Sequence, residues 1–430
     1  MEKMVIHGGS PLRGTVAVAG SKNAALPIMA ASLLTDEPVT LQNVPDLADV
    51  DTLIQVLAGL GVSNVRLPGG TVQLVADDTN RREADPELVS RMRASFCVLG
   101  PLVARRGYAK VALPGGCRIG DRPVDLHIKG LRQLGAEITV ERGQVIARAN
   151  RLRGASVNLL GKRGSTVTGT CNVLSAAVLA EGDTWIEGAA CEPEVVDVGR
   201  FLRALGARID GLGTSRIHVR GLPCLKGTTY RIIPDRIEAA TFMIAAALTG
   251  GEVQMTNVRR GQLVAVIAKL RQIGLTIEGD HTTLSVRADR SLRAADIEAL
   301  PYPGIPTDLQ AHLTALLAIA PGTSHIRDQV FPERFQHVAE LRRMGARIGV
   351  NGNSAVVRGV PSLVGAQVTA TDLRASAALV IAGLAAHGQT TVRQIHHLDR
   401  GYERLDEKLK ALGAEVARAV DELPIERLAA

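Results

Sequence analysis

Six very apolar segments rich in alanine recur along the chain at intervals of about 70 residues. Alanine and leucine favour helices, and these segments are apolar on nearly all sides. They therefore predict helices that are buried over most of their surface. Most of them end in a glycine-containing turn that leads into a short strand, as at 251–255. The six segments are residues 24–34, 94–104, 173–180, 239–248, 309–320 and 373–386.

A second element, Leu-x-x-Leu/Ile/Met-Gly, follows each apolar segment. The pattern is typical of the end of an amphipathic helix, where glycine adopts a left-handed conformation just after the last turn. A strand is expected next, for example at 137–140 and at 347–350. The six glycines are Gly61, Gly135, Gly206, Gly274, Gly345 and Gly413.

One repeating unit is therefore a buried helix, a strand, an amphipathic helix and one or more strands, and six copies fill the chain. The fold class is α/β. The spacing leaves open whether the units form an open solenoid or two closed groups of three. Closed groups are favoured because the unit is longer than common solenoid repeats. In addition, neither terminal copy has the polar face of a cap.

Composition excludes several classes of protein. Hydrophobic residues make up 46% and charged residues 22%, which is enough apolar material for a sizeable core and excludes disordered and collagen-like chains. A net charge of +7 favours an anionic partner. Nucleic acid is the least favoured partner, because ten aromatic residues among 430 are few for base stacking. The chain also contains no run of five Lys or Arg.

The five cysteines are odd in number and include no Cys-x-x-Cys pair, so neither a disulfide framework nor a zinc site is expected. Unpaired thiols are typical of the cytoplasm. The first residues lack the apolar core of a signal peptide, and the apolar runs are shorter than the ~18 residues that a membrane span needs. We expect a soluble cytoplasmic protein with no membrane partner, no metal and no cofactor.

Four of the six buried helices begin with a cation: Lys22, Arg93, Arg236 and Arg374. Ser, Thr and Asp near the other starts are explained by helix capping. Cations are not, because they oppose the partial positive charge of a helix N-terminus. Their recurrence predicts a polyanionic ligand where the helix starts converge.

A loop rich in proline and glycine, residues 113–127, carries Cys117 between two arginines, Arg118 and Arg122. Its length is typical of a mobile lid. Neighbouring cations favour a reactive thiolate, whereas a small buried thiol is the ordinary alternative. The residues alone do not decide between the two.

Two further motifs also leave alternatives open. Arg400, in Asp-Arg-Gly-Tyr-Glu-Arg at 399–404, is either part of the anion site or one of several surface charges at the start of the last amphipathic helix. Asp308 follows a stretch with two prolines at 302–307. It is either an ordinary acid in a first helical turn or a positioned general base. By itself the motif favours the first interpretation.

These motifs resemble the UDP-N-acetylglucosamine 1-carboxyvinyltransferase (enolpyruvyl transferase) family, nearly end to end and in the same order. The matching stretches are 20–25, 114–127, 234–238, 306–308, 371–376 and 399–403. The resemblance implies a two-domain inside-out α/β barrel fold with six repeats in two groups of three and the active site between the domains. It further implies a discontinuous domain, 1–21 with 234–430, and an inserted domain, 22–233, that carries the cysteine loop 113–127.

The reaction that the resemblance implies moves the enolpyruvyl group of phosphoenolpyruvate to the 3-hydroxyl of UDP-N-acetylglucosamine and releases phosphate. This is the first committed step of peptidoglycan precursor synthesis. Cys117 would be the general acid, a covalent acceptor of phosphoenolpyruvate and the target of fosfomycin. Asp308 would be the base. The implied catalytic residues are Lys22, Cys117, Asp308 and Arg400.

The resemblance also assigns the substrate contacts. Phosphoenolpyruvate would be held by Lys22, Arg93, Cys117, Arg122, Arg374 and Arg400. The nucleotide and its acceptor hydroxyl would be held by Asn23, Pro123, Val124, Asp125, Leu126, Thr166, Val167, Asp308, Val330 and Phe331.

Three positions that depart from the family pattern leave the identity of the acceptor substrate open. Thr168 stands where the family usually has glycine, Cys191 stands where it has arginine, and Cys171 is a further change nearby. The alternative is a relative that uses another nucleotide, such as uridine monophosphate, in nucleoside-antibiotic biosynthesis. The sibling enzyme that uses shikimate 3-phosphate is disfavoured because it has no loop cysteine as its acid.

Overall fold

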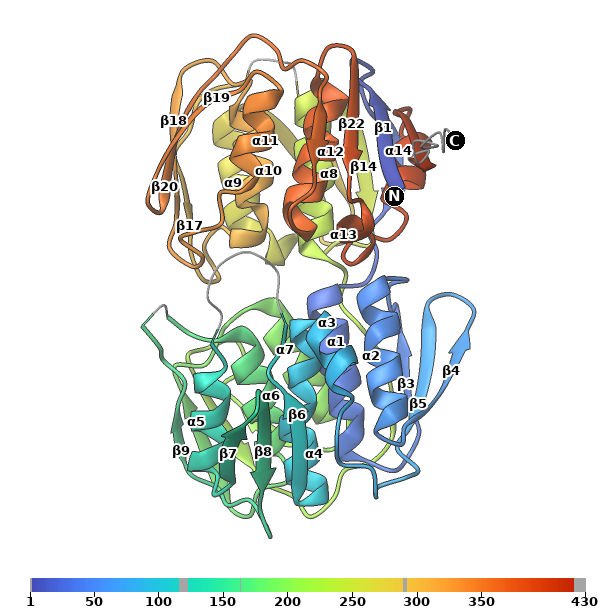
Figure 1. Cartoon of the computed structure of the whole chain (residues 1–430), viewed down its shortest axis with the longest axis vertical. Coiled ribbons are helices and arrows are strands. Elements are labelled where there is room, and N and C mark those ends of the chain that lie inside the picture. Colours follow the sequence, from blue (N-terminus) through green and yellow to red (C-terminus); the bar gives the residue numbers. More distant parts are fainter. Residues whose placement is uncertain (1, 116–122, 163, 289–291, 421–430) are drawn as a thin grey trace, which may run out of the picture.

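The computed structural model describes residues 2–115, 123–162, 164–288 and 292–420. Two lobes lie one above the other along the longest axis (Figure 1). The terminal lobe holds residues 2–17 and 236–420, and the inserted lobe holds residues 22–231. Both described ends of the chain therefore lie in the same lobe.

The chain crosses between the lobes twice, and the two crossing segments pair with each other. Gly20 and Pro234 form an isolated antiparallel bridge, and the amide of Ser21 donates to the carbonyl of Ile233 at 2.7 Å. A side chain at Gly20 would clash, because its Cβ would lie 1.7 Å from the carbonyl oxygen of Asn43. We propose that the domains divide at this double crossing, near residues 21 and 234.

Three four-stranded sheets form the outside of the terminal lobe. Strand β1 (Glu2–His7) is antiparallel to both of its neighbours, with Met4 opposite Val392 on one side and Arg418 on the other. This pairing joins the first residues of the chain to the last repeat. In spatial order the sheets are β21 (Gln367–Thr369), β22 (Gln389–Arg393), β1, β23 (Glu415–Val420); β15 (Leu275–Gly279), β16 (Leu284–Ala288), β14 (Glu252–Thr256), β2 (Arg13–Ala17); and β17 (Ile297–Ala299), β18 (Thr323–Asp328), β20 (Ser354–Arg358), β19 (Arg347–Asn351).

The inserted lobe is built in the same way from two four-stranded sheets and one three-stranded sheet. In spatial order these are β13 (Thr228–Arg231), β3 (Val39–Gln42), β5 (Thr71–Val75), β4 (Ser63–Leu67); β11 (Arg208–Asp210), β12 (Arg216–Arg220), β10 (Asp183–Glu187), β9 (Ser156–Asn158); and β6 (Tyr108–Ala112), β8 (Gln144–Arg148), β7 (Glu137–Glu141).

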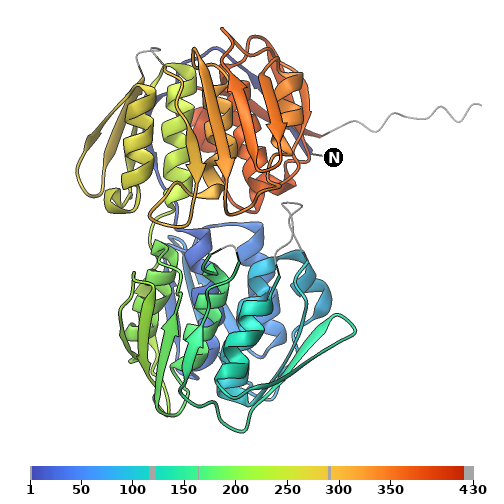
Figure 2. The same ribbon diagram turned by 90° about the vertical axis from the view of Figure 1, so that its left-hand side faces the viewer.

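All six predicted apolar helices are present in the structure, and they lie between the sheets of their lobes (Figures 1 and 2). Short 3₁₀ turns, η2 (Arg93–Val98) and η4 (Thr307–Leu309), precede two of them. Every residue of α8 is buried, as expected for a helix that is apolar on all sides. The six are α1 (Lys22–Ala31), α4 (Leu99–Arg106), α6 (Val167–Ala177), α8 (Arg236–Thr249), α10 (Gln310–Leu317) and α12 (Leu373–Ala385).

The amphipathic helices also end as predicted. The glycine after each adopts a left-handed conformation, from φ 77° at Gly61 to φ 118° at Gly274, which side chains other than glycine rarely tolerate. These helices are α2 (Ala48–Gly59), α5 (Asp125–Gln133), α7 (Pro193–Ala204), α9 (Val264–Ile273), α11 (His337–Arg343) and α14 (Leu405–Ala411). The remaining short helices are η1 (Ser32–Leu34), α3 (Pro86–Arg91), η3 (Arg260–Gln262) and α13 (His396–Asp399).

Each lobe buries its own hydrophobic core. One core gathers side chains from 4–18 and 237–416, and the other gathers side chains from 24–233. The helices form the centre and the sheets the outside, so the inside-out α/β arrangement is confirmed, although no closed barrel forms among the residues described. Within these residues, no helix has the length and apolar character needed to cross a membrane.

Candidate active site

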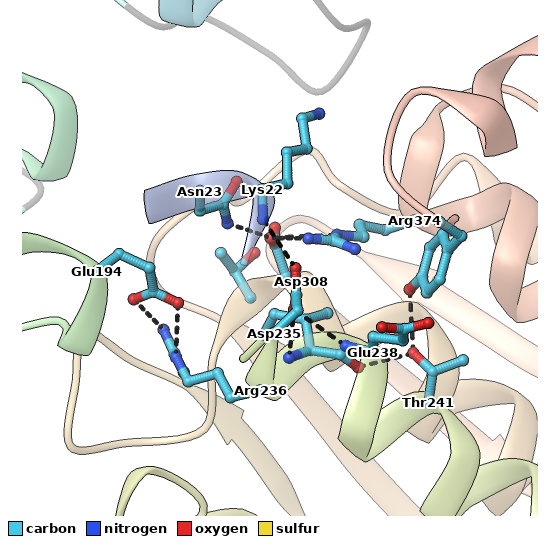
Figure 3. A network of polar contacts seen from close by, with 12 residues as sticks. Lys22, Asn23, Glu194, Asp235, Arg236, Glu238, Thr241, Asp308 and Arg374 are labelled. Atoms are coloured by element: carbon cyan, nitrogen blue, oxygen red, sulfur yellow. Dashed lines mark hydrogen bonds and ion pairs between the residues drawn. The ribbon is translucent and has the colours of Figure 1, made fainter. Parts of the chain in front are cut away.

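The starts of α1, α10 and α12 meet where the two lobes face each other (Figure 3). Their shared partner is the carboxylate of Asp308. The Asn23 amide nitrogen lies 3.4 Å from its Oδ2, and the Arg374 guanidinium reaches the same oxygen from Nε at 3.2 Å and Nη2 at 3.1 Å. Two predicted site residues from different lobes, Asn23 and Arg374, therefore meet on the carboxylate of a third, Asp308.

Asp308 has a second cation that the sequence did not reveal. Nη1 of Arg334 lies 2.8 Å from the other carboxylate oxygen of Asp308 and 3.1 Å from the hydroxyl of Thr307. Arg334 is 5% exposed, and its pKa is raised because the neighbouring carboxylates outweigh the lowering effect of burial. No repeat or helix start marks this arginine in the sequence.

The segment before Arg334 forms a turn fixed by Asp328. This carboxylate accepts the amides of Val330 at 2.9 Å and Phe331 at 2.7 Å, and its other oxygen accepts the Thr307 hydroxyl at 2.7 Å. The predicted acceptor contacts Val330 and Phe331 are thereby tied to the start of η4. They lie in the terminal lobe, beside Asp308.

Lys22 and Arg400 meet on a second carboxylate, the buried one of Asp49 in the first turn of α2. Lys22 Nζ lies 2.6 Å from Oδ2 and Arg400 Nε lies 2.8 Å from Oδ1. Burial lowers the pKa of Lys22, although Asp49 opposes this shift. Arg400 is thus placed at the junction, whereas the sequence left open a role as a surface charge and did not single out Asp49.

Arg374 is fixed by its own helix and by an aromatic ring. Asp372 caps α12 by accepting the amides of Arg374 at 2.9 Å and Ala375 at 3.1 Å. The guanidinium carbon lies 5.3 Å from the centre of the Tyr402 ring, and the Tyr402 hydroxyl lies 3.0 Å from His312 Nε2. Burial on its own lowers the pKa of Arg374, but Asp308, Tyr402 and Asp235 together outweigh burial and the pKa is raised.

Arg236 has a different place from the one predicted. Its Nε and Nη2 lie 2.9 and 3.2 Å from the two carboxylate oxygens of Glu194, which belongs to α7 of the inserted lobe (Figure 3). Both side chains are nearly buried, at 9% and 3% exposure. The charge of Arg236 is therefore compensated within the protein, and this cation links the lobes.

Arg93 lies in the inserted lobe at the start of η2. Its Nη2 donates to the carbonyl of Pro123 at 2.9 Å. The predicted nucleotide contacts Pro123, Val124, Asp125 and Leu126 directly precede or begin α5, so Arg93 anchors the segment that carries them. Asp125 is exposed and Val124 is buried.

The predicted nucleotide contacts Thr166 and Val167 lie at the start of α6. The Thr166 hydroxyl caps this helix by accepting the amide of Gly169 at 3.2 Å. The Thr168 hydroxyl lies 3.2 Å from His127 Nε2, and His127 Nδ1 lies 3.0 Å from the Asn172 amide nitrogen. Burial lowers the pKa of His127 to about 3, so this imidazole is neutral and links α5 to α6.

The other two departures from the family pattern have different surroundings. Cys171 is buried inside α6, and burial raises the pKa of its thiol. Cys191 is half-buried just before α7, where burial and then Glu192 raise its thiol pKa. Glu192 Oε1 accepts the amide of Tyr302 from the opposite lobe at 3.3 Å, so Cys191 is next to a contact between the lobes.

Three sequence-predicted residues lie outside the described part of the chain: Cys117, Arg118 and Arg122. Their roles remain predictions. Among the residues that the structure does describe, no cluster of three His, Cys, Asp or Glu side chains could hold a metal ion.

Comparison with known proteins gives matches along nearly the whole chain. A family model described as EPSP synthase (3-phosphoshikimate 1-carboxyvinyltransferase) matches residues 6–409. Two proteins named UDP-N-acetylglucosamine 1-carboxyvinyltransferase are similar to this chain. The one from Akkermansia muciniphila is 51% identical over 98% of this chain and 100% of its own length. The one from Nitratidesulfovibrio vulgaris is 53% identical over 97% of this chain and 99% of its own length.

Solved structures agree with this match. The enolpyruvyl transferase NikO from Streptomyces tendae has a TM-score of 0.89 at 27% identity and covers 97% of this chain and 98% of its own. An EPSP synthase from Acinetobacter baumannii has a TM-score of 0.77 at 21% identity and covers 98% of this chain and 100% of its own. At this identity the match supports the assignment of the fold and nothing further. The resemblance in the sequence is confirmed, and this chain belongs to the enolpyruvyl transferase family, among the UDP-N-acetylglucosamine 1-carboxyvinyltransferases.

Proposed function

We propose that this transferase moves the enolpyruvyl group of phosphoenolpyruvate to the 3-hydroxyl of UDP-N-acetylglucosamine and releases phosphate, the first committed step of peptidoglycan precursor synthesis. The observation that carries the proposal is the 48–53% identity, over almost the whole chain, to proteins named for this activity. The cations and the carboxylate at the junction of the lobes supply the chemistry that such a reaction needs.

Phosphoenolpyruvate carries a phosphate and a carboxylate. Lys22, Arg374 and Arg400 bring three cations from two lobes to the junction, and their side chains are largely withdrawn from water. Cations in a site that excludes water attract anions more strongly than cations at a surface do. We place phosphoenolpyruvate among these residues, with Arg93 on the side of the inserted lobe; a contact from Arg122 remains a prediction from the sequence.

The reaction has two stages. In the first, the acceptor oxygen forms a bond to C2 of phosphoenolpyruvate as its hydroxyl proton passes to a base, and a general acid donates a proton to C3. In the second, a proton leaves C3, the double bond re-forms and the bond from C2 to the phosphate oxygen breaks. Cys117 is the acid in this proposal and Asp308 is the base.

The surroundings of Asp308 support its role. Arg334 and Arg374 compensate its negative charge, and Asn23 from the opposite lobe lies beside the same carboxylate. A sugar hydroxyl that approaches from the inserted lobe would therefore meet both Asn23 and Asp308. Geometry of this kind, more than any intrinsic reactivity of an aspartate, makes a positioned base effective.

The uridine nucleotide would bridge the lobes. Pro123, Val124, Asp125, Leu126, Thr166 and Val167 belong to the inserted lobe, whereas Val330 and Phe331 belong to the terminal lobe. A ligand that contacts both sets must lie across the junction. Binding would then hold the lobes together and exclude water from the reacting groups. Because the four described cysteines carry free thiols, we also propose a cytoplasmic location.

Another nucleotide acceptor, such as uridine monophosphate, is the second candidate. The observation that favours it is the contact between Thr168 and His127, which lies at the start of α6 beside the predicted nucleotide contacts. The Thr168→Gly variant removes this contact. If Thr168 changes the acceptor, the ratio of turnover with the two nucleotides should shift by about tenfold, a difference of about 1.4 kcal/mol in transition-state free energy.

The test of the proposed function measures phosphate release from phosphoenolpyruvate with UDP-N-acetylglucosamine and with uridine monophosphate, side by side. Turnover with the sugar nucleotide alone would confirm the proposal. Turnover with the monophosphate alone would support enolpyruvyl transfer as the reaction but identify uridine monophosphate as the acceptor. Thr214→Gly, a change at an exposed surface turn, is the matched control for Thr168→Gly.

A further inference from the structure

Asp49 occupies an unusual place for an acidic side chain. It lies in the first turn of α2, where a carboxylate interacts favourably with the helix dipole, yet it is only 3% exposed. Asp51 lies in the same first turn and is exposed, with its carboxylate in an ion pair with Arg66 on the surface. Helix stability alone would be served equally well by an exposed acid, so the burial of Asp49 has another cause.

The carboxylate of Asp49 binds two cations that come from different lobes. Lys22 Nζ lies 2.6 Å from Oδ2. Arg400 reaches Oδ1 with Nε at 2.8 Å and Oδ2 with Nη2 at 3.5 Å, and it follows Asp49 by 351 residues in the chain. Two cations that would repel each other are held side by side, and the three side chains together carry a net charge of +1.

We infer that Asp49 is a positioning residue of the phosphoenolpyruvate site, which holds Lys22 and Arg400 together across the two lobes as a single anion-binding pair. The inference rests on the proposed function for the identity of the anion. Asp49 does not touch the reacting atoms in this account. It acts through the two cations.

The electrostatic surroundings of Lys22 support a second part of this role. Burial is the largest influence on its pKa and lowers it, and the charges of Arg374 and Arg400 lower it further. Asp49 is the group that opposes these effects. The Asp235 carboxylate accepts the backbone amide of Lys22 at 3.3 Å. Without the charge of Asp49, Lys22 would lose its proton at a lower pH.

The variant Asp49→Asn tests the inference because it keeps the shape of the side chain and removes the charge. The KM for phosphoenolpyruvate is expected to rise with pH, by about tenfold for each pH unit above the lowered pKa of Lys22. The KM for UDP-N-acetylglucosamine should change by less than about twofold, since a shift in one ionic contact acts only on the ligand that makes it. Wild-type KM values should stay nearly constant over the same range.

Two further variants separate positioning from general damage. Asp49→Glu restores the charge and should restore the flat pH profile, even if the KM itself is raised. Asp51→Asn is the matched control in the same helical turn and should behave as the wild type. If Asp49→Asn does not fold, Asp49→Ser replaces it. A pH profile of either neutral variant that superimposes on the wild type would overturn the inference.

A readout that does not depend on turnover distinguishes this inference from the proposed function. Trace acetic anhydride acetylates only neutral amines, so peptide mass spectrometry across a pH series reports the titration of Lys22. Half-maximal labelling of Lys22 should occur at a lower pH in Asp49→Asn than in the wild type, and unchanged labelling would count against the inference. If the wild type showed no turnover, the proposed function would fail while this labelling comparison still tested Asp49.

Discussion

The terminal and inserted lobes repeat one structural unit but begin their central helices with different chemistry. In the terminal lobe, Asp235 and Asp372 cap α8 and α12 through their carboxylates. In the inserted lobe, α6 is capped by the hydroxyl of Thr166, and neither Ser21 before α1 nor Met92 before η2 supplies a side-chain cap.

The difference separates what the fold needs from what the site needs. Most residues of the central helices are buried in both lobes, so burial by itself does not explain why only α8 and α12 have acidic caps. The terminal lobe presents its carboxylate base candidate, Asp308, with two arginines. The inserted lobe presents Lys22 and Arg93, and the sequence predicts that the cysteine loop belongs to this lobe. A repeated scaffold thus offers equivalent positions, and their side chains assign each lobe its part of the chemistry.

The largest effect is expected from removal of the inserted lobe's proposed acid. Cys117→Ala should lower turnover by about 10⁴-fold, the upper range for loss of a general acid, while the temperature of thermal unfolding stays unchanged. Phosphate release and thermal unfolding measure the two effects. Cys224→Ala, at an exposed thiol of the same lobe, is the control. In addition, fosfomycin should add its mass to the wild type and not to Cys117→Ala. Full activity of Cys117→Ala would show that Cys117 is not the general acid.

The next effect concerns the terminal lobe's proposed base. Asp308→Asn should lower kcat by about 10³-fold, because the acceptor hydroxyl loses its base and two guanidinium groups lose their shared carboxylate. Steady-state kinetics with both substrates measures the change. Asp296→Asn, an exposed acid of the same lobe beside His325, should retain wild-type activity. A kcat within tenfold of the wild type would show that the lobes do not divide the proton transfers as proposed.

A third prediction concerns the contact that keeps the two lobes together. Glu194→Gln leaves Arg236 buried without its counter-ion and should lower the free energy of unfolding by about 3 kcal/mol. Urea unfolding followed by circular dichroism measures this loss. Glu187→Gln removes an exposed pair with Arg216 and should cost less than about 1 kcal/mol. Equal losses in the two variants would mean that the buried pair contributes no more than a surface pair.

The smallest effect is a difference in the acid stability of the two lobes. Burial lowers the pKa of His312 to about 3 and of His337 to about 4 in the terminal lobe, and of His127 to about 3 in the inserted lobe. The unfolded chain binds these protons below pH ~6.5 and the folded chain does not. Stability is therefore full above pH ~6.5 and falls as the pH drops toward 3 to 4, by about 2 kcal/mol per histidine at pH 5.

The only tryptophan of the chain makes this difference measurable. Trp185 lies in β10 of the inserted lobe, so its fluorescence follows that lobe, whereas circular dichroism follows both. The terminal lobe has two such histidines and the inserted lobe has one. The terminal lobe should therefore unfold at a lower urea concentration at pH 5 than at pH 7. The urea transitions followed by fluorescence and by circular dichroism should then move apart. His281→Gln, at an exposed histidine, should leave the separation unchanged. Transitions that coincide at both pH values would contradict the prediction.

The sequence by itself determined the repeat, the six buried helices and the left-handed glycines that end the amphipathic helices. These features depend on local properties: helix propensity, the period of apolar positions and the freedom of glycine. The motifs also identified Lys22, Asn23, Asp308, Arg374 and Arg400 as candidates. The motifs alone favoured an ordinary first-turn acid for Asp308 and left open whether Arg400 was a surface charge, because an ordinary charge at a helix start and a site residue look alike in one sequence.

Only the tertiary structure decided the partners. It placed Arg400 on Asp49, which is 351 residues away in the chain, gave Asp308 a second cation in Arg334, and showed that Arg236 is bound by Glu194. No local rule relates such residues, since each pair forms only when elements from distant repeats pack together. A charge in a sequence has a sign, but its role depends on which opposite charge the fold buries beside it.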